Sequence, residues 1–416
     1  MRSGRTSFLG VALFALVFSC NSGPRADGVA RDASGAPLRL ATPRKQVPFV
    51  TLGDGRVLAS GGFDGQRALA SCEVFEPEMG LWSLTGAMLT PRRHHAGVRL
   101  LDGRVLVLGG TQGVGPGVLA SAEVFEPTTG TWAPVAPMTE AREDPAAVVL
   151  PDGRVLVAGG VDGDGRSLRS AEVFEPSTGT WAPVSPPGFV RGGAGTAVML
   201  PHGKALFVSG LQAELYDVAA GRWEKAGFAG GAAGTHRQGH SVTLLPDGRV
   251  LVVGGGTTRA SSTAEVYDGV TGLWTLVAPP AIPREHHAAV LTRDGSVLVM
   301  GGEHSTAGVL ASVERFEPAT GRWSSAPALE ERRELPGALT LPDGAVLLVG
   351  GANEMSALLA TSEKYQPGGC VPRTCAAHEA VCGAMADGCG GLLECGPCVL
   401  EGCDTQQCRA EGLTRR

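Results

Sequence analysis

Short apolar runs and glycine-containing turns alternate along most of the chain. In one stretch, the apolar run Ala96–Leu100 is followed by Asp102-Gly103, by a second apolar run, Arg104–Leu108, and by Gly109-Gly110. Because glycine accepts the positive φ that a tight turn needs, Asp-Gly between two apolar runs predicts a β-hairpin. The second run is apolar enough to be buried between neighbouring sheets.

Two further strands are predicted in the same stretch. Ala122–Phe125 has alternating character, the turn Pro127–Gly130 follows it, and Trp132 begins a fourth strand. Four antiparallel strands in a unit of this length are typical of a propeller blade.

The unit is repeated along the chain. Asp-Gly-Arg-Val-Leu occurs four times, two copies have Ser or Ala in place of Arg, and a weaker copy fills the one gap, so that seven copies begin 45 to 50 residues apart. A period of this length predicts a ring of repeated sheets. The copies begin at Asp54, Asp102, Asp152, His202, Asp247, Asp294 and Asp343.

The repeat resembles the kelch motif. It has Gly-Gly after the second strand, Glu-Val-Phe or Glu-Val-Tyr in the third, and Gly-x-Trp at the start of the fourth. The resemblance covers roughly Ser34–Pro367 and implies an all-β, seven-bladed kelch-type propeller, like those of galactose-oxidase-like proteins and many eukaryotic adaptors.

The ends of the repeat region predict how the ring closes. The last unit stops after Tyr365 without a fourth strand, and Ala36–Arg44 aligns with the segment that leads into the second unit. We expect Ser34–Leu40 to supply the outermost strand of the seventh blade, which satisfies its free backbone edge.

The N-terminus has the pattern of an export signal. Arg2 and Arg5 precede the apolar run Phe8–Phe18, which is too short to span a bilayer, so residues 1–19 are predicted to be a signal peptide. Val17–Cys20 resembles the lipobox of bacterial lipoproteins, which implies lipidation of Cys20 and a tether over residues 20–33. An ordinary signal peptide cut nearby is the alternative. Either way the protein is expected to be exported, to the cell envelope or beyond.

Residues 368–416 form a cysteine-rich tail with few large apolar residues. An even number of cysteines in an exported chain indicates disulfides, whereas zinc is the competing interpretation. The density of cysteine and glycine resembles small extracellular knots, some of which bind glycans. The cysteines are Cys370, Cys375, Cys382, Cys389, Cys395, Cys398, Cys403 and Cys408.

One arginine and one glutamate recur in every unit. In one interpretation the arginines ring the channel mouth and bind carboxylates or acidic sugars. In the other, which we favour because a repeated residue answers a repeated structural need, Arg–Glu pairs hold the loops together. The arginines are Arg44, Arg92, Arg142, Arg191, Arg237, Arg284 and Arg333; the glutamates are Glu73, Glu123, Glu172, Glu214, Glu265, Glu314 and Glu363.

The loops after Gly-Gly differ between units, and they are expected on the same face as the segments that lead into the innermost strands. Loops on a rigid scaffold are the usual place for recognition. The loops are Phe63–Arg67, Thr111–Val118, Val161–Arg169, Thr257–Ser262, Glu303–Gly308 and Ala352–Leu358. The residues expected on the ligand face are Arg44, Arg92, Arg142, Arg237, Arg284, His94, His240, His286 and Asp144.

The residues available do not favour a metal site or a copper-dependent active site. His95, His240 and His287 occupy equivalent positions without the close spacing of a ligand set, so neither metal nor cofactor is expected. A galactose-oxidase-like copper site needs two tyrosines, two histidines and a cysteine crosslinked to one of the tyrosines. The tyrosines all fall at third-strand packing positions, and Cys72 reads as a small buried residue; the tyrosines are Tyr216, Tyr267 and Tyr365.

These observations favour a binding protein over an enzyme. The net charge of −6 is evenly spread, which excludes a basic footprint for nucleic acid. The expected partner is a protein or a glycan at the cell surface, with membrane contact only through the lipid anchor. The alternative is a carbohydrate-active hydrolase or isomerase that uses channel-mouth carboxylates, for which Glu143, Asp144, Glu285 and Glu334 are available.

Overall fold

A computed structural model describes residues 38–113, 117–188, 196–210, 212–228, 238–256 and 263–367, together with two strands near the C-terminus. Gly28–Arg373 is one compact unit. The two C-terminal strands, β30 (Ala384–Ala386) and β31 (Leu392–Glu394), belong to a second unit and pair as an antiparallel hairpin. The predicted signal peptide, Cys20, the tether and the eight tail cysteines lie outside the described residues.

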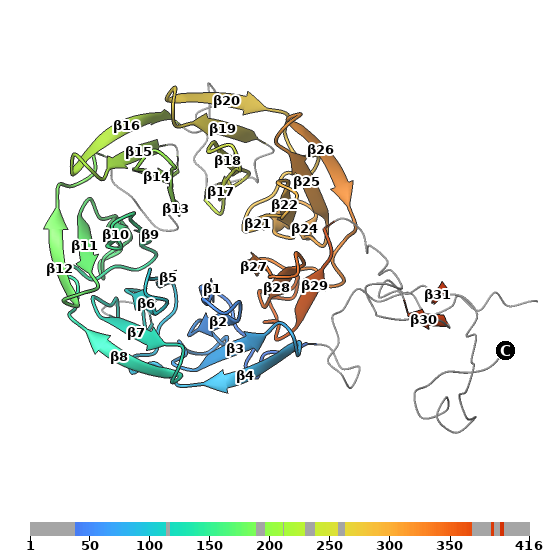
Figure 1. Cartoon of the computed structure of the whole chain (residues 1–416), viewed down its shortest axis with the longest axis horizontal. Coiled ribbons are helices and arrows are strands. Elements are labelled where there is room, and N and C mark those ends of the chain that lie inside the picture. Colours follow the sequence, from blue (N-terminus) through green and yellow to red (C-terminus); the bar gives the residue numbers. More distant parts are fainter. Residues whose placement is uncertain are drawn as a thin grey trace, which may run out of the picture. The chain divides into compact units, whose positions relative to one another are not determined.

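Within the described part of the first unit, seven antiparallel sheets surround a central axis (Figure 1). In each blade the strands run from the axis outwards in chain order. The first three blades are β1 (Phe49–Thr51), β2 (Val57–Ser60), β3 (Cys72–Glu76) and β4 (Leu81–Thr85); β5 (Ala96–Arg99), β6 (Val105–Leu108), β7 (Ala122–Glu126) and β8 (Thr131–Val135); and β9 (Ala146–Val149), β10 (Val155–Ala158), β11 (Ala171–Glu175) and β12 (Thr180–Val184).

The remaining blades confirm the all-β, seven-bladed propeller that the repeat predicts. Blade 6 carries an extra hairpin, β23 (Glu303–His304) and β24 (Gly308–Val309), and the described part of blade 7 has three strands. The strands are β13 (Thr196–Met199), β14 (Lys204–Ser209), β15 (Gln212–Asp217) and β16 (Arg222–Phe228); β17 (Ser241–Leu244), β18 (Val250–Val253), β19 (Ala264–Asp268) and β20 (Leu273–Val277); β21 (Ala288–Leu291), β22 (Val297–Met300), β25 (Val313–Glu317) and β26 (Arg322–Ala326); and β27 (Gly337–Thr340), β28 (Val346–Val349) and β29 (Ser362–Tyr365).

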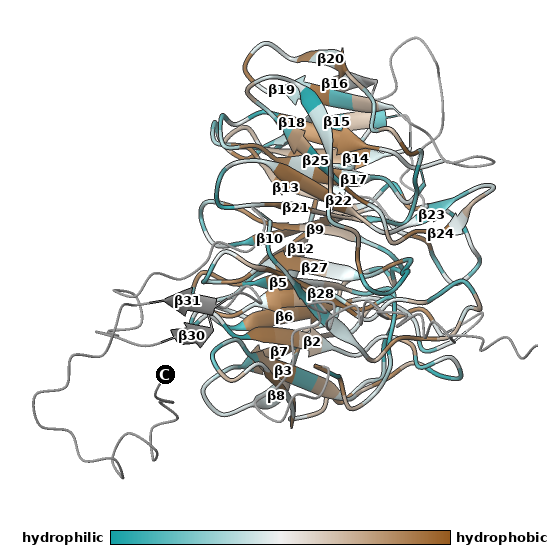
Figure 2. Cartoon of the chain, turned by 90° about the vertical axis from the view of Figure 1, so that its right-hand side faces the viewer, coloured by the Kyte–Doolittle hydropathy of each residue, from teal (hydrophilic) through white to brown (hydrophobic). Residues whose placement is uncertain are grey.

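The predicted hairpin turn and core strand are both present. Gly103 has φ +93°, its N–H donates to the Leu100 carbonyl at 3.0 Å, and β5 and β6 pair on either side. All four side chains of β6 are buried. Val105 and Val107 pack against blade 1, so the apolar core lies between blades, where Figure 2 shows the strands mostly in brown.

The Gly-Gly pair is explained by the approach of the next blade. The Gly110 N–H donates to the carbonyl of Arg142, which belongs to blade 3, at 2.7 Å. Gly109 has φ +66°, and a Cβ there would lie 2.5 Å from the Arg142 carbonyl oxygen of blade 3. Glycine is therefore required where two blades meet through their backbones. Gly351 donates to the Arg44 carbonyl in the same way and joins blade 7 to blade 1.

The N-terminal segment lies against the outer edge of blade 7, which confirms the predicted closure for Leu38–Leu40. The Leu40 N–H donates to the Ala360 carbonyl at 2.8 Å, and the Ser362 N–H donates to the Leu38 carbonyl at 2.9 Å. The side chains of Leu38 and Leu40 are 3% exposed and pack between Phe75 of blade 1 and Leu347 of blade 7.

The tryptophan contact between blade 1 and blade 7 also differs from the contacts between the other blades. In most blades the indole N–H of the fourth-strand tryptophan donates to a backbone carbonyl of the preceding blade, as Trp132 does to Gly86 at 2.9 Å. In blade 1, Trp82 instead donates to the Ser362 hydroxyl at 2.9 Å.

Among the described residues, no helix is long and apolar enough to cross a membrane.

Candidate functional site

The repeated arginines are buried and paired with the repeated glutamates. Arg92 donates from Nη2 to Glu123 Oε1 at 2.8 Å and from Nη1 to the carbonyls of Gly109 and Ser121, both at 2.9 Å. Glu123 in turn accepts hydrogen bonds from the backbone N–H groups of Leu89 and Thr90. The same pair recurs in four other blades, as Arg44–Glu73, Arg142–Glu172, Arg284–Glu314 and Arg333–Glu363.

This geometry confirms the Arg–Glu pairing and contradicts the expected place of Arg44, Arg92, Arg142 and Arg284 on the ligand face. All four side chains are completely buried. Burial lowers the pKa of Arg92 from its ordinary value, and the glutamate partner opposes that shift. These guanidinium groups donate to oxygen atoms of their own blades and have no exposed surface with which to contact a ligand. Arg237, the fifth arginine expected there, lies outside the described residues.

The residue two positions after each repeated arginine lies where the chain turns into the innermost strand. In every blade where this position is described it has a positive φ, between +50° and +65°. The innermost strands surround the axis in Figure 1, so these residues form a ring at one end of the channel, which we call the mouth ring. Its described members are Gln46, His94, Asp144, Gly239, His286 and Leu335.

Backbone hydrogen bonds join the mouth ring from blade to blade. The Asp144 N–H donates to the His94 carbonyl at 2.8 Å, and the His286 N–H donates to the Gly239 carbonyl at 2.8 Å. His94 and Leu335 donate in the same way to the preceding blade. The left-handed conformation recurs whatever the residue type, so it is a requirement of the fold. The backbone is therefore constant around the mouth ring while the side chains vary.

A cavity of about 330 Å³ opens beside the mouth ring. It is lined from blades 1, 4, 5, 6 and 7, and its walls include Gln46, Thr196, His240, His286 and Leu335. The Gln46 Oε1 atom is buried and accepts no hydrogen bond from the described residues. His240 and His286, both expected on the ligand face, thus line one cavity.

The opposite end of the innermost strands has a larger cavity, of about 520 Å³. Its walls come mainly from the Asp-Gly turns and the residues beside them, including Leu101, Asp102 and Pro151. The blades share this sequence, whereas the residues at the mouth ring differ between blades. The mouth end is therefore the better candidate for recognition.

The equivalent histidines are buried beneath the mouth ring and do not converge on one point. His287 Nε2 lies 2.8 Å from Ser241 Oγ of the preceding blade, and His95 Nε2 lies 3.5 Å from Ser60 Oγ. Burial lowers the pKa of His287 to about 3 and the pKa of His95 well below its ordinary value. These rings are neutral parts of the contacts between blades.

We expect acidification to weaken the propeller through His287. The folded-state pKa is depressed, so below about pH 6.5 the unfolded chain takes up a proton that the folded chain refuses, and stability falls until the pH reaches about 3. Between pH 7 and pH 5 this amounts to about 2 kcal/mol. Urea unfolding at pH 7 and pH 5 measures the change. His287→Gln should lose less free energy of unfolding between the two pH values than the wild type does, whereas the control His304→Gln should lose as much as the wild type. An equal pH dependence in all three proteins would contradict it.

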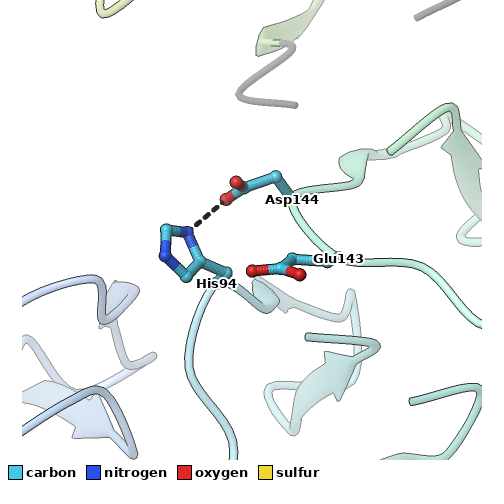
Figure 3. Close-up of side chains that lie close together, drawn as sticks. All are labelled: His94, Glu143 and Asp144. Carbon is cyan, nitrogen blue, oxygen red and sulfur yellow. Dashed lines mark hydrogen bonds and ion pairs between the residues drawn. The ribbon is translucent and has the colours of Figure 1, made fainter. Parts of the chain in front are cut away.

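Two groups of charged side chains lie at the mouth end. His94 Nδ1 is 2.8 Å from Asp144 Oδ1, and one ligand atom from each of His94, Glu143 and Asp144 lies within 4.8 Å of the others (Figure 3). At the boundary of blades 1 and 7, Lys45 Nζ of blade 1 is 3.8 Å from Glu334 Oε1 of blade 7. Burial raises the pKa of Glu334, and its neighbour Glu303 adds to that shift.

The tyrosines and Cys72 occupy packing positions. Tyr216 and Tyr267 are buried against Trp223 and Trp274, with ring centroids 5.1 and 4.8 Å apart. Cys72 is a buried free thiol in β3, and burial raises its pKa to about 11. None of these groups lines the mouth cavity.

The described loops after Gly-Gly begin on the mouth face, as predicted, whereas the loop Thr257–Ser262 lies outside the described residues. The described loops pair with the residue that follows a repeated arginine, as Phe63 does with Lys45, Thr111 with Arg93, and Ala352 with Glu334. The sequence interpretation singled out His94, Asp144 and His286, but it missed Gln46 and Leu335. The signal that finds them is register: each stands two residues after a repeated arginine.

Comparison with known proteins defines the class. A model of the kelch motif matches residues 49–89, 92–139, 145–188 and 286–330. The chain therefore contains kelch motifs and folds as a seven-bladed β-propeller. No curated protein matches its sequence.

Among solved structures, the chain is similar to a fungal alcohol oxidase of the AA5 family, described as having catalytic diversity and solved in complex with copper. The TM-score is 0.66 at 19% identity, over 79% of this chain and 75% of the oxidase. At this identity the similarity is one of fold.

Proposed function

We propose that the protein is an exported binding protein of the cell envelope, which engages a protein or a glycan through the mouth ring and the loops around it. The observation that carries the proposal is the mouth ring itself. One backbone conformation, fixed by hydrogen bonds between blades, carries five residue types at the six described positions. A rigid scaffold with variable side chains is suited to selective binding, because little conformational entropy is lost when the ligand binds.

The cavity beside the mouth ring supports a ligand with both polar and apolar groups. Leu335 and Pro336 supply an apolar wall, whereas Gln46, His240 and His286 supply polar atoms. Its volume lies near the lower end of about 300–1,000 Å³ found for small-molecule sites. A sugar unit or one projecting side chain of a protein partner matches that size.

Export is proposed from the N-terminal residues. The basic start, the short apolar run and Cys20 support a lipid-anchored protein of the cell envelope or a secreted one. The cysteine-rich tail supports the same compartment, because clustered disulfides persist where the surroundings are oxidising.

The binding proposal can be tested with a variant that the chain itself suggests. Since blade 5 already has Gly239 in the mouth ring, we expect Gln46→Gly/His286→Gly to fold. Binding is measured on a glycan array and by crosslinking envelope proteins to the mature protein. For each glycan or protein that the wild type binds, the double variant should bind at least about tenfold more weakly.

The matched control alters the opposite face. Leu101 is exposed at the Asp-Gly end of the channel, so Leu101→Ala should bind as the wild type does. Full binding by the mouth-ring variant, or an equal loss in Leu101→Ala, would refute the mouth as the binding face.

The second candidate function is a carbohydrate-active enzyme. It is favoured by the raised pKa of Glu334 beside Glu303, since a raised pKa makes a carboxyl group better suited to act as a general acid. Turnover of a retained glycan, abolished by Glu334→Gln, would favour this function over simple binding.

A further inference from the structure

At the boundary of blades 2 and 3, the channel mouth carries a histidine and two carboxylates, the residue types of a metal site. His94 belongs to blade 2, while Glu143 and Asp144 belong to blade 3, and one ligand atom of each lies within 4.8 Å of the other two. Imidazole and carboxylate are ligands for divalent transition ions, and ligand atoms bound to one ion stand about 3–4 Å apart. The 2.8 Å contact from His94 Nδ1 to Asp144 Oδ1 is a hydrogen bond, and a bound ion would take the place of its proton.

The backbones that carry these side chains are fixed to one another. The Asp144 N–H donates to the His94 carbonyl at 2.8 Å, across the boundary between the two blades. The backbone of Glu143 exchanges two hydrogen bonds with that of Val161, at 2.8 and 2.9 Å. Preorganisation of this kind lowers the entropic cost of binding an ion.

The charge of the cluster is not balanced by the described residues. Neither Glu143 nor Asp144 forms an ion pair with a lysine or arginine in the part of the chain that the structure describes. In Figure 3 the Asp144 carboxylate is joined to the His94 ring by a hydrogen bond, and the Glu143 carboxylate lies below it on the same side of His94. A divalent cation would neutralise the charge of these two carboxylates, and the His94 imidazole offers a further ligand atom.

The opposite side of the mouth ring provides an internal comparison. At the boundary of blades 6 and 7 the equivalent residues are His286, Glu334 and Leu335, so leucine stands where blade 3 has Asp144. Glu334 there already faces Lys45 at 3.8 Å. One ligand is missing and a cation is already present, which distinguishes this boundary from the cluster around His94.

We propose that His94, Glu143 and Asp144 bind a divalent cation at the channel mouth, through the imidazole nitrogen Nδ1 and the two carboxylates. With the ion bound, the ring proton lies on Nε2. Three protein ligands leave coordination positions for water or for an oxygen atom of a bound molecule. The inference goes beyond the proposed binding role and does not depend on it, because the ion alone is the ligand.

Binding of Mn²⁺ to the full mature chain tests the site. Mn²⁺ is the suitable probe because carboxylates accept it readily whereas thiolates select other metals, so the cysteine-rich tail competes little. The electron paramagnetic resonance signal of free Mn²⁺ should fall as about one ion binds per chain, with a dissociation constant of about 10⁻³ M or lower, as in extracellular cation sites.

Variants assign the ion to these side chains. Asp144→Asn and His94→Asn should each weaken Mn²⁺ binding at least about tenfold. The matched control is Glu285→Gln, which removes the carboxylate equivalent to Glu143 in blade 6 and should leave binding unchanged. Unchanged melting temperatures would show that the variants remain folded.

Three results would overturn the site: no saturable binding by the wild type up to about 10⁻² M, well beyond the weakest extracellular sites; equal binding by Asp144→Asn; or an equal loss in Glu285→Gln. None of them bears on whether the mouth ring binds a protein or a glycan, so failure of the metal site and failure of the proposed function are distinguishable.

Discussion

Replacing Leu38 and Leu40 together by alanine is expected to destabilise the propeller by about 4 kcal/mol or more, as the sum of two buried leucine truncations. Both side chains are 3% exposed and fill the space between blade 7 and blade 1. The backbone of this segment also satisfies the outer edge of blade 7, through the Leu40 and Ser362 N–H groups. The segment adds to the Gly351–Arg44 and Trp82–Ser362 hydrogen bonds across this seam, so its apolar side chains and backbone contribute to closing the ring there.

The loss should appear first at the seam. In the double variant, hydrogen exchange should become faster at the Ser362 amide, while amides of β10 on the far side of the ring keep their protection until global unfolding. The urea midpoint gives the overall change. The control Leu89→Ala/Leu101→Ala removes two exposed leucines and should change stability by less than about 1 kcal/mol. If the two double variants unfolded at the same urea concentration, the closing role of the segment would be refuted.

Removal of one partner of a buried Arg–Glu pair should have an effect of similar size. We expect Glu123→Ala to cost about 3–5 kcal/mol, because it leaves the Arg92 guanidinium buried without its counter-charge. The backbone N–H groups of Leu89 and Thr90 lose their acceptor at the same time. The urea midpoint and the melting temperature both measure the change.

Two further variants separate charge from packing. Glu123→Gln keeps an oxygen for the backbone donors and should be less damaging than Glu123→Ala. Arg166→Ala breaks an exposed ion pair with Asp164 and should leave the urea midpoint unchanged. A loss below about 1 kcal/mol in Glu123→Ala would show that the pair adds little to stability, contrary to its burial.

The fold could be predicted because the same turn and strand patterns recur in each blade. Asp102-Gly103 determines a hairpin locally, Val105–Leu108 is apolar on both faces, and the same order returns seven times. Local turn chemistry and periodicity agree with the global fold, and such agreement is what makes a sequence interpretable. The closing segment was also predictable, since one strand was missing at one end and available at the other.

The place of the arginines was harder to predict from sequence alone. A repeated arginine beside a repeated glutamate fits both a charged rim and a structural pair, and we favoured the pair while still naming Arg44, Arg92, Arg142 and Arg284 among the ligand-face candidates. Burial depends on how closely the next blade approaches, which is a property of the ring. In the structure the guanidinium reaches two carbonyls and a carboxylate of its own blade, and this decides its role.

The sequence by itself determined the seven sheets, their turns, the closing strand and the end of the channel where the blades differ, because these follow from short-range patterns and from counting. Only the tertiary structure decided which of the side chains at the mouth meet one another. His94 and Asp144 stand 50 residues apart and meet only because neighbouring blades present equivalent residues side by side. Contacts between blades depend on the closed ring, and no local pattern encodes them.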